Sequence, residues 1–242
     1  MLGLGAYLSV LLPLVGTVAF DRFARRFLAI RFIQRPPTAE EYRKCMNMAV
    51  FNLQWLFILT LSMGPLMERT LLPRSAPLPG LTEVVAKLLL FLFLDDLWFY
   101  AYHRLVHAVP WLYVTLHKQH HLFTVPFPEV TLAVHPAELM LLSLGTCIGP
   151  LGIYYKQTHP LIFYGYTIVR QLQVFLDHFG WELKRPLHSP ASLAPRVFGG
   201  TAFHDLHHQK FKCNYSSLFS VIDWAFGTAV FVEGDDELKK LQ

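Results

Sequence analysis

Charged side chains are scarce in this chain of 242 residues. They make up 16% of it, whereas roughly a quarter is usual in soluble domains, and apolar residues reach 53% with a mean hydropathy of +0.36. No repeat of fixed period and no low-complexity tract divides the sequence. The composition argues against an ordinary soluble protein and predicts an integral membrane protein.

Cysteine is also scarce, and the positions of the cysteines do not indicate disulfide bonds. Cys45, Cys147 and Cys213 are scattered, odd in number and never spaced as Cys-x-x-Cys. We therefore expect neither a disulfide framework nor a thiolate zinc site. The reducing side of a membrane is the simpler environment for such a chain.

A strongly basic surface is lacking too. The net charge is only +4, and no basic stripe with interleaved aromatic residues runs through the sequence, so nucleic acid is not an expected partner. The main basic cluster lies in residues 21–44, which hold seven Lys or Arg directly after the apolar run Leu2–Phe20. Because no charged side chain precedes that run, it predicts an uncleaved anchor and not a signal peptide.

Apolar stretches recur at lengths that suit membrane helices, for which about 20 residues cross the hydrocarbon. The excess of Lys and Arg in 21–44 over 68–83 predicts that the first of these loops is cytoplasmic. The resulting fold class is all-α: a helical integral membrane protein of four or five spans with a cytoplasmic, histidine-rich helical cap. The expected spans are Leu2–Phe20, Met48–Met67, one starting near Val84, and a hairpin of Pro136–Tyr155 and Leu161–Leu176 that is interrupted at Gly149-Pro150.

Histidine is absent from the first 102 residues, and all twelve histidines lie between 103 and 208. Residues three or four apart share one face of a helix, so a short histidine box can direct two or three imidazoles to one place. Asp96 and Tyr100 would continue the face of the first box. Three such boxes occur: His103-x3-His107, His117-x2-His120-His121 and His204-x2-His207-His208.

These boxes predict a metal centre. Neutral imidazole binds iron, copper, zinc and nickel, so the ligand type alone does not select the metal. Eight box histidines exceed the needs of one tetrahedral zinc ion, and an all-nitrogen set is a poor match for the two-histidine, one-carboxylate iron site. Two metal ions in a shared histidine cage fit best. The predicted ligands are His103, His107, His117, His120, His121, His178, His204, His207 and His208.

Three other histidines are harder to assign. His135 and His188 can be metal ligands or pocket residues, while His159 is expected to be a plain loop residue away from the centre. For Asp95, one interpretation is that it lies at the membrane interface and has no further role. Arg170 lies in an apolar stretch, and a polar network and snorkelling to the interface remain equal alternatives for it.

Four carboxylates are expected to orient the ligands. Glu138, Asp177 and Asp205 each lie beside a histidine or one turn from one, where they can accept the imidazole N–H opposite the metal. Asp96 can do the same for the first box. We expect no catalytic residue beyond the metal centre itself.

The boxes and their neighbouring motifs resemble a known group. The motifs are Asp96-x2-Phe99-Tyr100 before the first box, Ala133-Val134-His135-Pro136-Ala137-Glu138, Phe203-His204-Asp205-Leu206-His207-His208, Asn214-Tyr215-Ser216-Ser217 and Asp223-Trp224-Ala225-Phe226-Gly227-Thr228. With these motifs, the sequence resembles the sterol desaturase and fatty acid hydroxylase superfamily of membrane di-iron oxygenases, and within it most closely the C-4 methylsterol monooxygenases, over about residues 84–232.

Two departures from the family pattern lie near the expected pocket. His178-Phe179-Gly180-Trp181 stands where the family usually has His-Ser-Gly-Tyr, and Leu132 stands where an acidic residue is common. The substrate can therefore differ from a methylsterol, although the metal boxes are intact.

The resemblance implies a reaction and its partners. Two iron ions would activate O2 with electrons from NAD(P)H, delivered through a cytochrome b5-like carrier and its reductase, to hydroxylate an unactivated C–H of a membrane lipid such as a sterol. Such chemistry belongs to a metal cofactor and not to side-chain acids and bases. The implied parts are a two-span anchor region in 1–83, a fatty acid hydroxylase-like catalytic domain in 84–232 and a cytosolic tail in 233–242.

Other functions remain open. A sterol or fatty-acyl desaturase would share the boxes, and a divalent-metal transporter or a non-catalytic lipid-binding protein would belong to another class. Lys239-Lys240 resemble a dilysine retrieval signal, which implies the endoplasmic reticulum membrane and a cytosolic C-terminus, although two lysines in a solvated tail are also ordinary.

Overall fold

The computed structural model describes residues 2–28, 30–72, 75–183 and 197–231. Its long helices are α1, α2, α4, α6 continued by η4, and α7, and shorter elements connect them. The bounds are α1 Leu2–Phe27, β1 Ile30–Phe32, α2 Ala39–Ser62, α3 Gly64–Thr70, α4 Leu81–Ala108, α5 Pro110–Leu112, η1 Tyr113–His117, η2 His120–Leu122, η3 Pro128–Leu132, α6 Pro136–Cys147, η4 Ile148–Ile153, α7 Pro160–Asp177, β2 Trp181–Leu183, α9 Thr201–Lys210 and α10 Ser220–Ala225.

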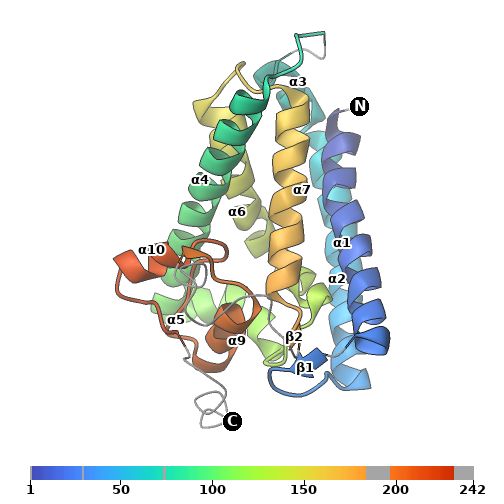
Figure 1. Cartoon of the computed structure of the whole chain (residues 1–242), viewed down its shortest axis with the longest axis vertical. Coiled ribbons are helices and arrows are strands. Elements are labelled where there is room, and N and C mark those ends of the chain that lie inside the picture. Colours follow the sequence, from blue (N-terminus) through green and yellow to red (C-terminus); the bar gives the residue numbers. More distant parts are fainter. Residues whose placement is uncertain (1, 29, 73–74, 184–196, 232–242) are drawn as a thin grey trace.

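The long helices run side by side (Figure 1), and their pairwise contacts form a closed ring. α1 packs along both α7 and α2, α2 touches α6, and α4 packs against α6 and α7. The contact between α2 and α6 is the sparsest around the ring. The cap elements α5, α9 and α10 gather at one end of this bundle (Figure 1).

The bundle carries apolar side chains on its outside as well as its inside. In α2, the buried stripe is Cys45, Ala49, Asn52 and Leu56, at the spacing of one helical face. Trp55 and other large apolar residues of the same helix are exposed. A helix that is apolar on both faces suits a lipid environment, since in water the outer face would be polar.

Local sequence sets the ends of α2. Thr38 and Glu41 form a capping box that starts the helix, and the helix ends at Ser62, before the Gly64-Pro65 pair that begins α3. The helix of the second candidate span is therefore Ala39–Ser62 and not the predicted Met48–Met67, because it begins at its cap, before the apolar run.

Within the described residues, three helices are long and apolar enough to cross a membrane: α1, α2 and α6 with η4. We expected four or five spans. α4 and α7 run alongside these three, but α4 carries Asp95 and Asp96, and α7 carries Arg170. At the predicted break, Gly149-Pro150, the chain forms a π-helical turn and the helix continues to Ile153.

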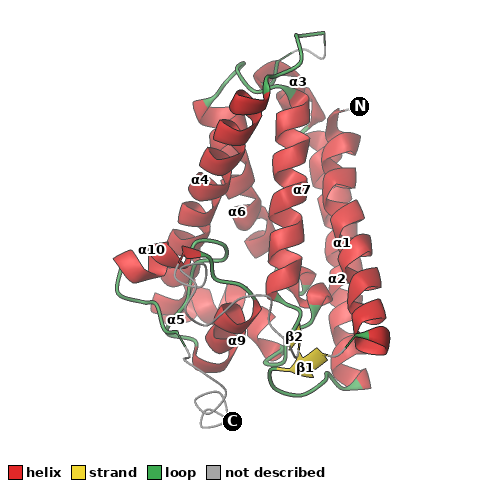
Figure 2. Ribbon diagram, in the orientation of Figure 1, coloured by secondary structure: helices red, strands yellow, loops and turns green. Residues whose placement is uncertain are grey.

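Strand structure is minimal. In the described part of the chain it consists of β1 and β2, which pair antiparallel with Phe32 opposite Trp181 and Ile30 opposite Leu183 (Figure 2). This ribbon joins the end of α1 to the segment after α7. The all-α prediction is otherwise confirmed.

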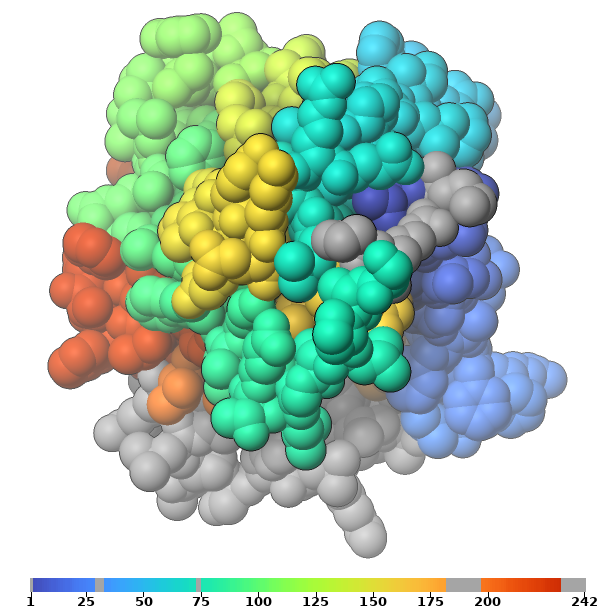
Figure 3. Space-filling model, turned by 90° about the horizontal axis from the view of Figure 1, so that it is seen from above, coloured from blue at the N-terminus to red at the C-terminus, as the bar shows by residue number. Residues whose placement is uncertain are grey.

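The end of the bundle opposite the cap is closed by connecting segments. Figure 3 views this end, where α3, the start of α4 and the turn after η4 cover the helices. The backbone N–H of Leu72 donates to the carbonyl of Thr158 at 2.9 Å, and that of Lys156 donates to the carbonyl of Thr70 at 2.6 Å. These bonds tie the α3 end to the turn between η4 and α7.

Candidate metal centre

Nine histidines converge into two groups near the cap end of the bundle. Within each group, the candidate ligand atoms all lie within 4.8 Å of one another. All three boxes contribute, and the second and third boxes each supply both groups. The first group is His103, His107, His117, His121 and His207, and the second is His120, His178, His204 and His208.

The first group is built around His117 and His121. The Nε2 atom of His117 lies 3.0 Å from that of His103 and 2.9 Å from that of His121. The Nε2 atom of His121 lies 3.2 Å from those of His107 and His207. Five imidazole nitrogens thus point at one another from α4, η1, η2 and α9.

The second group is built around His204. Its Nε2 atom lies 3.0 Å from that of His178, at the end of α7, and 3.2 Å from that of His208. His120 completes the group, with its Nε2 atom 3.4 Å from that of His178. The two groups adjoin, since the ring centroids of His121 and His208 are 4.9 Å apart.

The second box is not a regular α-helix. Tyr113–His117 forms a π-helical turn and His120–Leu122 a 3₁₀ turn, whereas the predicted spacing assumed an α-helix. π-helical turns are frequent at functional sites. The change of helix type allows His117 and His121 to face one group and His120 the other.

The protonation of these side chains suits metal binding. Burial lowers the pKa of His204, His207 and His208 well below the usual value, and the neighbouring histidines lower it further. The imidazoles are therefore neutral at pH 7, which is the form that binds metal.

Backbone carbonyls select the tautomer of several ligands. The Nδ1 of His103 lies 2.8 Å from the carbonyl oxygen of Tyr215, and that of His207 lies 2.7 Å from the carbonyl of Cys213. An N–H at Nδ1 leaves the Nε2 lone pair free for a metal. The residues thus fit a pair of metal ions held by histidine.

The segment that presents these carbonyls is itself fixed by Asp223. Its carboxylate accepts the backbone N–H groups of Tyr215 and Ser216 at 2.8 and 2.7 Å. Asn214 has a positive φ of 58°, which asparagine tolerates better than most residues. Sequence reasoning noted these motifs only through the resemblance, and no spacing rule indicated that backbone oxygens here would contact ligands.

Among the four predicted carboxylates, Glu138 contacts a ligand as expected: its Oε1 lies 2.5 Å from Nδ1 of His117. The partners of the others differ. Asp96 accepts the backbone N–H groups of Ser217, Leu218 and Phe219 and so holds the 217–219 turn, not the first box.

Asp177 and Asp205 bind polar side chains. Asp177 accepts the hydroxyl of Ser217 at 2.9 Å and an amide N–H of Gln173. Asp205 accepts amide N–H groups from Gln34 at 3.0 Å and Gln209 at 2.6 Å. The prediction failed here because position along a helix does not reveal which long-range partner a carboxylate meets.

The remaining histidines lie elsewhere. His135 is the N-cap of α6 and its Nδ1 accepts the backbone N–H of Ala137 at 3.2 Å, so it belongs to neither group. His159 is buried and caps α7 in the same way, which a plain loop residue would not do. His188 lies outside the described residues.

An internal cavity extends from the histidines into the bundle. Its polar end includes His103, His117, His120, His178 and His204. Its walls come from α4, α6, α7 and the 131–134 segment. The apolar wall residues are Phe99, Leu132, Val134, Leu139, Leu142 and Val174.

A buried ion pair also lies on the cavity wall. Arg170 and Asp95 are 4% and 3% exposed, and the Nε of Arg170 donates to Asp95 at 2.5 Å. The polar-network alternative for Arg170 is therefore the correct one, and Asp95 is not merely interfacial.

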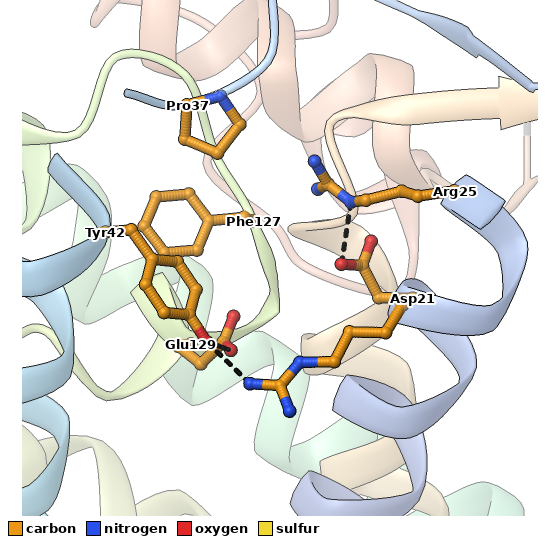
Figure 4. A pocket seen from close by; sticks show the side chains of 7 residues that line it. Asp21, Arg25, Pro37, Tyr42, Phe127 and Glu129 are labelled. Carbon is orange, nitrogen blue, oxygen red and sulfur yellow. Dashed lines mark hydrogen bonds and ion pairs between the residues drawn. The ribbon is translucent and has the colours of Figure 1, made fainter. Parts of the chain in front are cut away.

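A second hollow lies where α1, α2 and the start of η3 meet (Figure 4). Its polar groups are engaged with one another. Arg22 donates to the hydroxyl of Tyr42 at 3.0 Å, that hydroxyl donates to Glu129 at 2.8 Å, and Arg25 donates to Asp21 at 2.7 Å. This network ties the helix ends together beside the cap.

Comparison with known proteins adds a family match. The sequence model of the fatty acid hydroxylase family matches residues 88–228. No solved structure matches the chain.

Curated relatives carry several different names. Very-long-chain aldehyde decarbonylase GL1-11 of Oryza sativa subsp. indica is 33% identical over 77% of this chain and 65% of its own length. Methylsterol monooxygenase 2-2 of Arabidopsis thaliana is 35% identical over 64% and 56%, and cholesterol 25-hydroxylase of Rattus norvegicus is 33% identical over 79% and 62%. The chain thus spans about 56 to 65% of the length of these relatives.

Proposed function

The chain belongs to the fatty acid hydroxylase family, and from that premise we propose that it is a membrane-bound di-iron monooxygenase that hydroxylates an unactivated C–H of a lipid, with a sterol as the first candidate. Two groups of converging, buried imidazole nitrogens at the end of an apolar cavity carry this proposal. The relatives named as methylsterol monooxygenase and cholesterol 25-hydroxylase support the substrate class.

The histidines would hold the two metals as the groups divide them: five around one ion and four around the other. Five nitrogens exceed the four of a tetrahedral zinc site, which favours iron. Bound iron would supply O2 activation and C–H oxidation, chemistry that side chains lack.

The chain's own residues would position substrate and ligands. Glu138 accepts the Nδ1–H of His117 and holds that ring with Nε2 toward the metal site. The apolar wall formed by Leu139, Leu142 and Val174 would bind the lipid by burial and exclude water from the reacting carbon.

The proposal extends to topology and partners. The basic residues of 21–44 lie at the same end of the bundle as the histidines, which supports a cytosolic metal centre by the positive-inside bias. A soluble face would allow an electron carrier such as cytochrome b5 to deliver electrons from NAD(P)H. We propose that 1–83 is the membrane anchor, 84–232 the catalytic domain and 233–242 a cytosolic tail. The proposed location is the endoplasmic reticulum membrane. The tail, with Lys239-Lys240, lies outside the described residues.

A second candidate is conversion of a long-chain aldehyde at the same centre. The relatives named very-long-chain aldehyde decarbonylase are about as similar as the sterol enzymes and match more of the chain than the methylsterol monooxygenase does. A desaturase would use the same histidines.

Isotope labelling separates these outcomes. Iron-loaded protein would be incubated with a reductant, ¹⁸O2 and either sterols or long-chain aldehydes, and products analysed by mass spectrometry. A monooxygenase gives lipid alcohols containing one ¹⁸O, a desaturase gives loss of two hydrogens without ¹⁸O, and a decarbonylase gives a chain shortened by one carbon.

His207→Ala should abolish the product, while His135→Ala, outside both groups, should retain it. If the active, iron-loaded protein gave a product that contains no ¹⁸O, the monooxygenase proposal would be contradicted.

A further inference from the structure

The cavity carries a polar group deep in the bundle, away from the histidines. Arg170 of α7 and Asp95 of α4 both line the cavity although almost all of their surface is buried. A buried ion pair commonly contributes little to stability compared with an apolar pair of similar volume. Because the pair also lies on the cavity wall, we consider a role in binding a molecule inside the cavity.

The hydrogen bonds of Arg170 leave part of its guanidinium unused. The group has five N–H donors. Nε donates to Asp95 at 2.5 Å, and Nη1 donates to Ser217 at 3.1 Å and to Gln173. In the part of the chain that the structure describes, no acceptor bonds Nη2.

We propose that Nη2 of Arg170 is the subsite that binds a neutral oxygen of the lipid, either an alcohol or a carbonyl, while the carbon to be oxidised lies at the histidines. This inference rests on the proposed function, because it assumes a lipid in the cavity. It adds a substrate class: lipids with an uncharged oxygen at a fixed distance from the reacting carbon.

The charge balance argues for a neutral group. The positive charge of Arg170 is already paired with Asp95, and Asp96 lies next to Asp95 in the same helix. A lipid carboxylate would bring a further negative charge beside these groups in a low-dielectric interior, where like charges repel strongly. A hydroxyl or carbonyl oxygen can accept the Nη2 donors without that cost.

Helix geometry gives the spacing of the backbone positions. Arg170 precedes His178 by eight residues at the end of α7, and Asp95 precedes His103 by eight along α4. At 1.5 Å per residue, these positions are about 12 Å apart along each helix. The anchored oxygen and the reacting carbon should therefore be separated by several carbon atoms of the lipid.

Other polar side chains line the cavity as well, among them Gln171 and Thr146. Ser143 already donates to the carbonyl of Leu139 at 2.7 Å. Thr146 provides the matched control, since Thr146→Val keeps the shape and removes the hydroxyl.

The test is equilibrium binding to the purified full-length protein with two matched sets of radiolabelled probes. One set is hexadecan-1-ol, hexadecane and hexadecanoate, and the other is cholesterol, cholestane and cholesteryl sulfate. In at least one set, we expect the alcohol to bind about tenfold or more tightly than the hydrocarbon and the anion, as a hydrogen bond to a charged group allows. Equal binding within both sets, or tightest binding of an anion, would overturn the proposal.

Variants then assign the preference to Arg170. Arg170→Lys keeps a positive charge beside Asp95 but removes the Nη2 donors, so the alcohol should lose most of its advantage while hydrocarbon binding stays unchanged. Thr146→Val should keep the advantage, and loss in that variant with retention in Arg170→Lys would place the anchor on α6. If Arg170→Lys does not fold, the double variant Asp95→Asn with Arg170→Met removes the pair together and the same loss is expected.

Iron analysis of the same samples separates this inference from the proposed function. Two irons without an alcohol preference would remove the anchor and leave the oxygenase proposal standing. An alcohol preference in protein that binds no iron would support the anchor and contradict the oxygenase proposal.

Discussion

Glu138 shows how a single residue can decide the state of the candidate metal centre. It is 1% exposed and lies 2.5 Å from His117, whose Nε2 atom contacts those of His103 and His121. The carboxylate therefore fixes the ring that links the first group. A side chain that orients a ligand in this way commonly changes metal affinity by ten- to a hundredfold.

We expect Glu138→Ala to lower the affinity of the first metal about ten- to a hundredfold, because His117 then loses the acceptor that orients it. Competition with a chelator of known affinity, followed by metal analysis, measures this. Ser143→Ala is the control, since Ser143 lies on the same helix and its hydroxyl bonds only the backbone of that helix among the described residues. Equal affinity in Glu138→Ala and wild type would show that Glu138 does not orient a ligand.

At the residue scale, the sequence predicted which histidines converge but not which groups accept hydrogen bonds from them. Histidine spacing predicted eight of the nine residues that converge, because i,i+3 and i,i+4 positions share a helical face, and the expected return of the chain after 161–176 predicted the ninth, His178. The carbonyls of Cys213 and Tyr215 could not be predicted, since a backbone oxygen carries no sequence signal. Asp96 failed for a related reason: its partners are backbone N–H groups 121 to 123 residues away.

At the scale of elements, α4 and α6 approach each other closely at Gly145. A Cβ atom built there would lie 2.2 Å from Oδ1 of Asp95 and 2.8 Å from the ring of Trp98. The indole of Trp98 donates to the carbonyl of Leu141 at 2.9 Å, which locks the same two helices together. Only glycine allows this packing, and the packing positions one wall of the cavity.

Gly145→Ala should therefore destabilise the protein by about 1–3 kcal/mol, the usual cost of overpacking. Thermal unfolding of the purified protein in detergent measures the effect. Gly165→Ala on α7 is the matched control, because a Cβ there meets nothing within 4 Å, and its effect should be neutral or slightly stabilising. If both variants unfolded at the same temperature as wild type, close packing at Gly145 would not matter.

Helix prediction succeeded where apolar runs are long and failed at their ends. α1 and α7 lie where apolar runs predicted them, whereas α2 begins nine residues before Met48, at its capping box. The π-helical turns at Tyr113–His117 and Ile148–Ile153 were not predicted, since π-helix is rare and no periodicity in the sequence marks it.

At the scale of the whole molecule, the bundle and the cap depend on each other through the histidines. The candidate ligands come from α4, the C-terminal end of α7, α9 and the 113–122 segment, which are far apart in sequence. Bound metal would therefore cross-link the cap to two bundle helices. The protein with metal should resist unfolding more than the protein without it.

Chelation should lower the unfolding temperature reversibly, and iron should restore it. Differential scanning fluorimetry with added chelator, followed by iron repletion, measures this. The His135→Ala variant should respond as wild type does, and His204→Ala should already unfold at a lower temperature and gain less from iron. An unfolding temperature that is indifferent to chelation in wild type would show that metal does not join cap and bundle.

The most direct test of the central claim is the iron content of the purified wild-type protein, measured by elemental analysis and iron spectroscopy on material kept free of stray zinc. We expect about two irons per chain, coupled as a pair, because two adjoining histidine groups are present. His207→Ala and His204→Ala should each lower this content, one through each group. One zinc per chain, or folded protein that binds no iron when iron is supplied, would contradict the di-iron account.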